Sequence, residues 1–163
     1  AHTVFECIDH LFGDDPEVVR QILEMRPKID YQPFLDLLDP EPGLLECLAK
    51  INKLYTLAML TNRSDTLNAL VSTHRLDNYF SQIIGCLDVK EPKPDPEGAF
   101  RLLEINSCRA DESVYIGDTM TDVLTAKAAK IPFIAYKNPQ LPAWRNLDHF
   151  DDLQAMLVER AGQ

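Results

Sequence analysis

Apolar side chains recur every three or four positions through the first forty residues, which is the spacing of helices that bury one face. The first run covers residues 4–12. The second begins at Asp15-Pro16, a capping residue followed by proline at the first helical position. The sequence Asp-Pro-Glu-Pro-Gly at 39–43 then interrupts the pattern. We therefore expect a small helical unit, a reduced cap, over residues 1–39.

From residue 40 to residue 163 the pattern changes to short apolar runs that alternate with amphipathic segments. The expected strands are 55–60, 83–86, 114–116 and 131–136, and the expected helices begin near residues 42, 65, 96, 121 and 153. Alternation of this kind predicts an α/β fold, a doubly wound parallel sheet with helices on both faces. Trp144 is expected in a polar loop, as a packing anchor for the terminal segment.

Composition narrows the class of protein. The chain is 45% hydrophobic and 26% charged, which is ordinary for a soluble domain, and no apolar run approaches the roughly 20 residues of a membrane span. A net charge of −10 argues against a nucleic-acid partner. The four cysteines lie far apart, without zinc or redox spacing, which favours a reduced, cytoplasmic protein in which Cys47 and Cys86 are core residues.

Polar residues follow the predicted strand 55–60. Thr61, Asn62 and Ser64 stand where this strand ends and the next helix begins. Ligands of doubly wound sheets bind outside the carboxyl ends of the strands, and the amino end of a helix presents free N–H groups to anions. These residues therefore predict a phosphate site. The alternative is that Thr61 and Ser64 only cap the following helix.

Two acids follow the predicted strand 114–116. Asp118 comes two residues after the strand, and Asp122 lies on the first turn of the next helix, so both carboxylates can face one point. Two carboxylates at one strand end repel each other unless a cation lies between them. Mg²⁺ prefers such oxygen ligands and leaves positions for a phosphate. The alternative is that both acids cap the helix.

Lys93 is surrounded by Pro92, Pro94 and Pro96. Proline fixes its own φ and restricts the residue before it, so Lys93 is held in a defined extended segment. Such rigidity suits an ammonium that must be aimed at a transferring phosphoryl group. The alternative is a rigid loop without a chemical role.

These features, in this order, resemble the haloacid dehalogenase superfamily of phosphohydrolases, and residues 1–39 resemble a reduced form of the cap of its phosphoglycolate phosphatase-like subgroup. The resemblance rests on Leu60-Thr61-Asn62, Lys93-Pro94-Asp95-Pro96 and Tyr115-Ile116-Gly117-Asp118-Thr119-Met120-Thr121-Asp122.

The resemblance implies a role for each site residue. Thr61, Lys93 and Asp118 are the implied catalytic residues, and Thr61, Asn62 and Lys93 are the phosphate-binding ones. Asp118 is the implied direct ligand of Mg²⁺, and Asp122 supports that metal site. The implied reaction is hydrolysis of a small phosphorylated metabolite through an aspartyl-phosphate.

One motif of the family does not occur in this sequence. Members begin with an apolar strand that ends in Asp-x-Asp, whose first Asp is the nucleophile and whose second is the general acid/base. We expect that strand to precede Ala1 and to lie in the sheet between the strands that end at Thr61 and Gly117, so that the 163-residue chain is inactive by itself.

Other functions remain open at this point. A phosphomutase uses the same residues, and a non-catalytic interaction module would have discarded its nucleophile. A phospho-signalling receiver domain is disfavoured, because receivers place the acidic pair first and this chain places it last. The substrate and the oligomeric state are not predicted. Four basic residues of the first segment are expected at the surface: His10, Arg20, Arg26 and Lys28.

Overall fold

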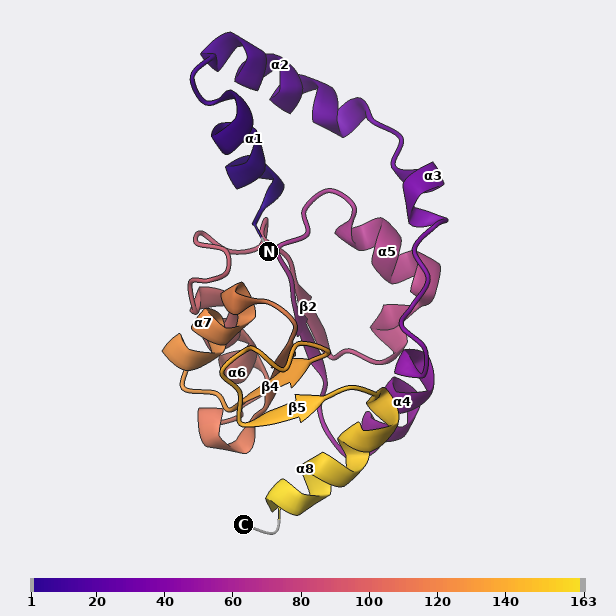
Figure 1. Ribbon diagram of the computed structural model, residues 1–163. Coiled ribbons are helices and arrows are strands. Elements are labelled where there is room, and N and C mark those ends of the chain that lie inside the picture. The colour runs from indigo at the N-terminus through magenta and orange to yellow at the C-terminus, as the bar shows by residue number, and fades with distance from the viewer. Residues whose placement is uncertain (1, 162–163) are drawn as a thin grey trace.

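The computed structural model describes residues 2–161 and begins with three helices. These are α1 (Val4–Phe12), α2 (Pro16–Met25) and, after a 3₁₀ turn at Arg26–Lys28, α3 (Gln32–Leu35). We call residues 4–35 the helical arm. Figure 1 shows α1 and α2 projecting away from the rest of the molecule, while α3 returns beside α5. The division into units 1–39 and 40–163 stays a prediction.

The rest of the chain forms parallel strands joined by helices. Strand β1 (Ala58–Leu60) pairs with β2 (Gln82–Ile84), while β4 (Phe133–Tyr136) lies between β3 (Tyr115–Gly117) and β5 (Arg145–Leu147). The helices are α4 (Leu44–Ile51), α5 (Leu67–His74), α6 (Glu97–Ile105), α7 (Met120–Ala128) and α8 (Leu153–Ala161). The predicted α/β fold with a parallel sheet is confirmed.

Alternate side chains of β4 explain the layers on its two faces. Ile134 is fully buried and packs in one cluster with Leu48 of α4 and Leu153 of α8. Phe133 and Ala135 point to the opposite face, where they pack against α7. Because successive residues of a strand face opposite sides, this apolar strand requires a helical layer on each side.

Strand β5 was not predicted. It lies in the stretch expected to be a polar loop, and only one of its three residues, Leu147, is buried. A short exposed edge strand of this kind has no alternating pattern to detect. The Trp144 amide, just before the strand, donates to the Phe133 carbonyl at 2.8 Å and extends the pairing with β4.

Within residues 2–161, the sheet is divided into two parts. Strand β1 pairs with β2 alone, and β3 pairs with β4 alone. The carboxyl end of β1 nevertheless lies close to the helix that follows β3, because the Lys93 ammonium donates both to the Leu60 carbonyl and to Asp122 of α7. None of the helices in this described range is long and apolar enough to cross a bilayer.

Candidate functional site

A buried ion pair joins the carboxyl end of β1 to the start of α7. The Lys93 ammonium donates to Asp122 Oδ1 at 2.7 Å and to the Leu60 carbonyl at 3.1 Å. The two side chains are only 10% and 7% exposed. Lys93 therefore lies where the strands end, the position that the sequence predicted for it.

Asp122 is held by further groups from β3 and the first turn of α7. Thr119 donates to Oδ2 from its hydroxyl at 2.5 Å and from its amide at 3.2 Å, and the Tyr115 hydroxyl donates to Oδ1 at 3.2 Å. Thr119 and Asp122 form a capping box, so the capping alternative holds for Asp122 and not for Asp118. The pattern Thr-x-x-Asp is the sequence signal that could have revealed Thr119, whereas Tyr115 had none.

These partners determine the charge state of the cluster. Burial raises the pKa of Asp122, but the hydrogen bond and positive charge of Lys93, together with Thr119 and Tyr115, hold that pKa below its usual value. Burial and then the charge of Asp122 raise the pKa of the Tyr115 phenol above its usual value. At neutral pH, Asp122 is therefore ionised and Tyr115 is a hydrogen-bond donor.

Gly117 permits the close approach of α7 to β3. A Cβ atom at this position would lie 2.6 Å from Asp122 Cβ and 2.7 Å from its Cγ. A side chain here would therefore displace Asp122 from Lys93. The glycine of the Gly-Asp-x-x-x-Asp motif thus has a packing role.

Asn62 fixes the backbone at Lys93. Its amide group donates to the Lys93 carbonyl at 2.9 Å, and its Oδ1 accepts from the Lys93 amide at 3.1 Å. Asn62 is buried, and these two bonds connect the loop after β1 to the proline-flanked segment. No sequence signal indicated this role, and the predicted contact of Asn62 with phosphate stays a prediction.

Thr61 continues from β1 without capping α5. Its amide donates to the Ile84 carbonyl at 2.9 Å, and its Oγ1 accepts from the Arg63 amide at 3.1 Å. The N-cap of α5 is Thr66, so the alternative that Thr61 or Ser64 caps this helix is wrong. Because the Thr61 oxygen is the acceptor in its bond to Arg63, the hydroxyl proton is available to a ligand.

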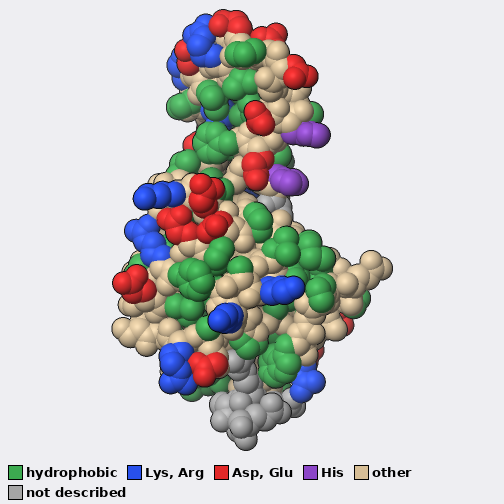
Figure 2. Space-filling model, turned by 90° about the vertical axis from the view of Figure 1, so that its left-hand side faces the viewer, with side chains coloured by type: hydrophobic (Ala, Val, Ile, Leu, Met, Phe, Trp, Pro, Cys, Tyr) green, Lys and Arg blue, Asp and Glu red, His purple; other side chains and the backbone are tan. Residues whose placement is uncertain are grey.

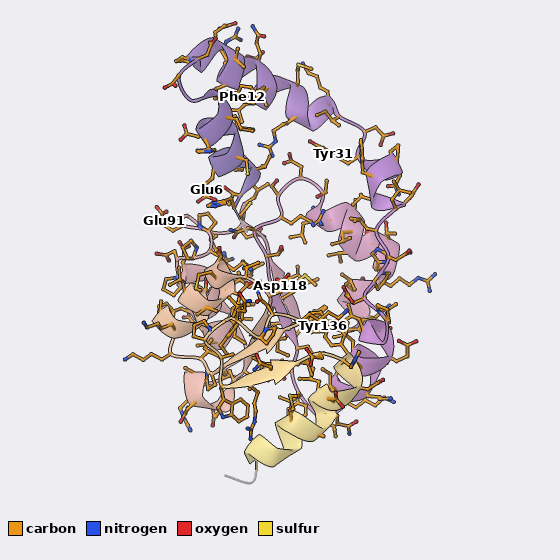
Figure 3. The ribbon with its side chains drawn as sticks, in the orientation of Figure 1. Glu6, Phe12, Tyr31, Glu91, Asp118 and Tyr136 are labelled. Atoms are coloured by element: carbon orange, nitrogen blue, oxygen red, sulfur yellow. The ribbon has the colours of Figure 1, made fainter. Side chains whose placement is uncertain are left out.

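Asp118 differs from Asp122 in its surroundings. Figure 3 shows Asp118 near the centre of the molecule, between the sheet and the helical arm. Its side chain is exposed and forms no hydrogen bond or ion pair with another residue of the described chain, while its carbonyl accepts from Asn138 at 3.0 Å. A free carboxylate suits one position of a Mg²⁺ ion that keeps several waters.

The remaining metal ligands are not assembled by residues 2–161. Across this range no group of three or more His, Cys, Asp or Glu side chains could hold a metal ion. Both oxygens of Asp122 already accept hydrogen bonds within the protein. The metal role of Asp118 and the supporting role of Asp122 stay predictions.

Comparison with known proteins adds an independent finding. A family profile described as haloacid dehalogenase-like hydrolase matches residues 7–136. The phosphoglycolate phosphatase of Mesorhizobium japonicum is 32% identical over 130 residues, which are 74% of this chain and 57% of that protein. That of Pseudomonas fluorescens is 32% identical over 126 residues, which are 76% of this chain and 46% of that protein. The chain thus spans about half the length of these relatives.

A solved structure is similar over nearly the whole chain. The crystal structure of a HAD-superfamily hydrolase from Geobacter sulfurreducens superposes with a TM-score of 0.79 and 31% sequence identity, covering 96% of this chain and 74% of that one. Because the superposition covers 96% of this chain, the similarity includes the helical arm as well as the sheet.

Proposed function

Because the chain belongs to the haloacid dehalogenase-like hydrolase family, we propose that it forms the phosphate-binding part of a Mg²⁺-dependent hydrolase of small phosphomonoesters. The observation that carries this proposal is the buried Lys93–Asp122 pair at the carboxyl ends of β1 and β3. A desolvated, fixed positive charge at this edge is suited to a phosphoryl group whose negative charge grows during transfer.

Lys93 keeps one N–H for a ligand. An ammonium has three donors, and two of them are used by Asp122 and the Leu60 carbonyl. Asp122 thus acts through Lys93, whose ammonium it orients, while Thr119 and Tyr115 keep Asp122 ionised and in place. Together with the hydroxyl proton of Thr61, Lys93 offers two donors to the phosphate oxygens.

We place the nucleophile on a strand outside the 163-residue sequence, inserted between β1 and β3. The division of the sheet at this point supports the proposal, as does the engagement of both Asp122 oxygens, which leaves Asp122 unsuited to attack phosphorus. The first carboxylate of that strand would displace the alcohol, which would take its proton from the second Asp of the Asp-x-Asp motif, the general acid. Water, which would give its proton to the same second Asp, would then attack the phosphorus of the aspartyl-phosphate, release inorganic phosphate and restore the first carboxylate.

Mg²⁺ would neutralise charge on the phosphate and the nucleophile, with Asp118 as one of its ligands. We expect Asp118→Asn to weaken Mg²⁺ binding roughly tenfold or more, because an amide oxygen carries no net charge. A tenfold weaker affinity corresponds to a loss of about 1.4 kcal/mol of binding free energy. Calorimetric titration of the variant and the parent tests this. Asp77→Asn is the matched control, because Asp77 is also exposed but lies in the turn before β2. Equal affinities in all three proteins would remove Asp118 from the site.

Thr61→Val tests the phosphate site itself. The substitution keeps the shape of the side chain and removes the O–H donor, so phosphate affinity is expected to fall roughly tenfold, the loss of one hydrogen bond to a charged group. Phosphorus NMR titration with inorganic phosphate measures it. Thr73→Val, an exposed threonine of α5, is the control. If the Thr61 variant binds phosphate as the parent does, Thr61 is not a ligand.

A further inference from the structure

Arg26 joins the helical arm to the loop that carries Thr61 and Asn62. The surface position predicted for Arg26 is wrong, because the residue is only 6% exposed. Its Nη2 donates to Ser64 Oγ at 3.3 Å and to the Asp65 carboxylate. Its guanidinium carbon also lies 4.4 Å from the centre of the Phe5 ring in α1. Arg26 therefore contacts both the arm and the loop after β1.

The contact of Arg26 lies directly beside the proposed phosphate-binding residues. Ser64 and Asp65 follow Thr61 and Asn62 directly, and the side chain of Asn62 holds the backbone of Lys93. A continuous set of contacts thus leads from the arm, through Arg26 and the loop after β1, to the ammonium of Lys93. Figure 2 shows that the molecule narrows between the projecting part of the arm and the larger part.

Stability alone does not explain this arginine. Its Nε is buried and has no hydrogen-bond partner among the described residues, which is a desolvation cost left without compensation. Buried ion pairs seldom contribute more stability than apolar residues of similar size, whereas they do fix one arrangement of the groups that they join. We therefore expect the main effect of this contact to be the fixed position of the groups that it joins, and not a gain in folding stability.

We propose that Arg26 is a positioning residue: it holds residues 61–65 in their phosphate-binding arrangement through Ser64 and Asp65 and so couples this loop to the helical arm. The proposal rests on the proposed function for its phosphate site. Coupling of this kind is reciprocal. Phosphate bound at Thr61 and Lys93 therefore slows amide exchange in the arm, and this protection disappears when Arg26 is removed.

Hydrogen exchange and phosphate titration of the 163-residue chain test the proposal. Arg26→Met and Asp65→Asn are each expected to speed exchange of amides 61–66 about tenfold, because the loop opens more often. Each is also expected to weaken phosphate binding about fivefold, at the low end of typical coupling between sites. The double variant is expected to match Arg26→Met, because the ion pair that Asp65→Asn weakens is already absent in that variant. Arg20→Met is the matched control, since Arg20 is exposed and pairs only within α2, with Glu17 and Glu24.

The outcomes separate the two proposals. If Arg26→Met speeds exchange only within the arm and leaves amides 61–66 and phosphate affinity unchanged, Arg26 is an anchor of the arm and the inference is overturned. Additive effects of the two substitutions overturn it as well. If the parent binds no phosphate, the proposed function fails, and the exchange of amides 61–66 still decides the role of Arg26. If Arg26→Met does not fold, Asp65→Asn, at a side chain 31% exposed, decides it.

Discussion

Replacing Lys93 with methionine is expected to lower the free energy of unfolding by about 3–5 kcal/mol, because Asp122 is then left buried without its counter-charge. Both side chains are almost fully buried, so solvent does not screen the loss. Methionine is similar in length to lysine and fills most of the same space, which isolates the effect of the charge. Urea denaturation at neutral pH measures the change.

The double variant Lys93→Met/Asp122→Asn shows where the loss originates. Removing both charges leaves no uncompensated carboxylate, so this variant is expected to recover most of the stability that Lys93→Met loses. Lys137→Met is the control, because Lys137 forms an ion pair with Glu41 in which both side chains are nearly half exposed. Such a pair contributes about 1 kcal/mol or less. If single and double variants are equally unstable, Lys93 does not compensate Asp122.

The same pair gives a pH dependence with a defined sign. Burial raises the pKa of Asp122, but Lys93 and the other donors lower it further, so its folded pKa is below its unfolded value. The stability that this shift contributes is therefore present above the unfolded pKa of about 4 and is lost as the pH falls through the folded pKa. In Lys93→Met the positive charge that opposes burial is absent, so the pKa of Asp122 is expected to be higher than in the parent. The difference between parent and variant is therefore expected to shrink as the pH falls toward about 4.

The sequence predicted one site of Thr61, Lys93, Asp118 and Asp122, because the carboxyl ends of parallel strands lie at one edge of a sheet. The structure brings Lys93 into contact with Asp122 and with the Leu60 carbonyl beside Thr61, and the shared site stays a prediction. It also predicted that Cys47 and Cys86 are buried, and both are buried free thiols. These predictions needed only local periodicity and the general rule for ligand sites in doubly wound sheets.

Long-range side-chain contacts could not be predicted in the same way. The bonds of Asn62 to Lys93 span 31 positions and those of Arg26 to Asp65 span 39, and neither pair belongs to a local motif. Arg26 was predicted at the surface because an isolated arginine in a polar stretch is usually solvated. Its burial depends on partners far away in the sequence, which the local pattern does not reveal. The separate roles of Asp118 and Asp122 depended on the first turn of α7, where the capping box engages Asp122 alone of the two.

The second large effect concerns the proposed strand between β1 and β3. A strand at this position would form hydrogen-bond ladders on both sides and bury apolar side chains between the two helical layers. We expect the chain that includes it to be more stable than the 163-residue chain by about 5 kcal/mol or more, at roughly 1 kcal/mol per hydrogen bond and about 1.5–3 kcal/mol per buried aliphatic side chain. Urea denaturation of both chains compares them, and equal midpoints and slopes would show that no strand has been added.

The central claim is that residues 1–163 supply phosphate-binding groups, while the nucleophile lies on that strand. Hydrolysis of p-nitrophenyl phosphate with Mg²⁺ tests it most directly. Three proteins are compared: the 163-residue chain, the chain extended by its native upstream residues, and that extended chain with the first aspartate of its Asp-x-Asp motif changed to asparagine. The account predicts turnover by the extended chain alone, because binding groups do not replace a covalent nucleophile. Comparable turnover by the 163-residue chain, or an extended chain without an aspartate after an apolar strand, would contradict it.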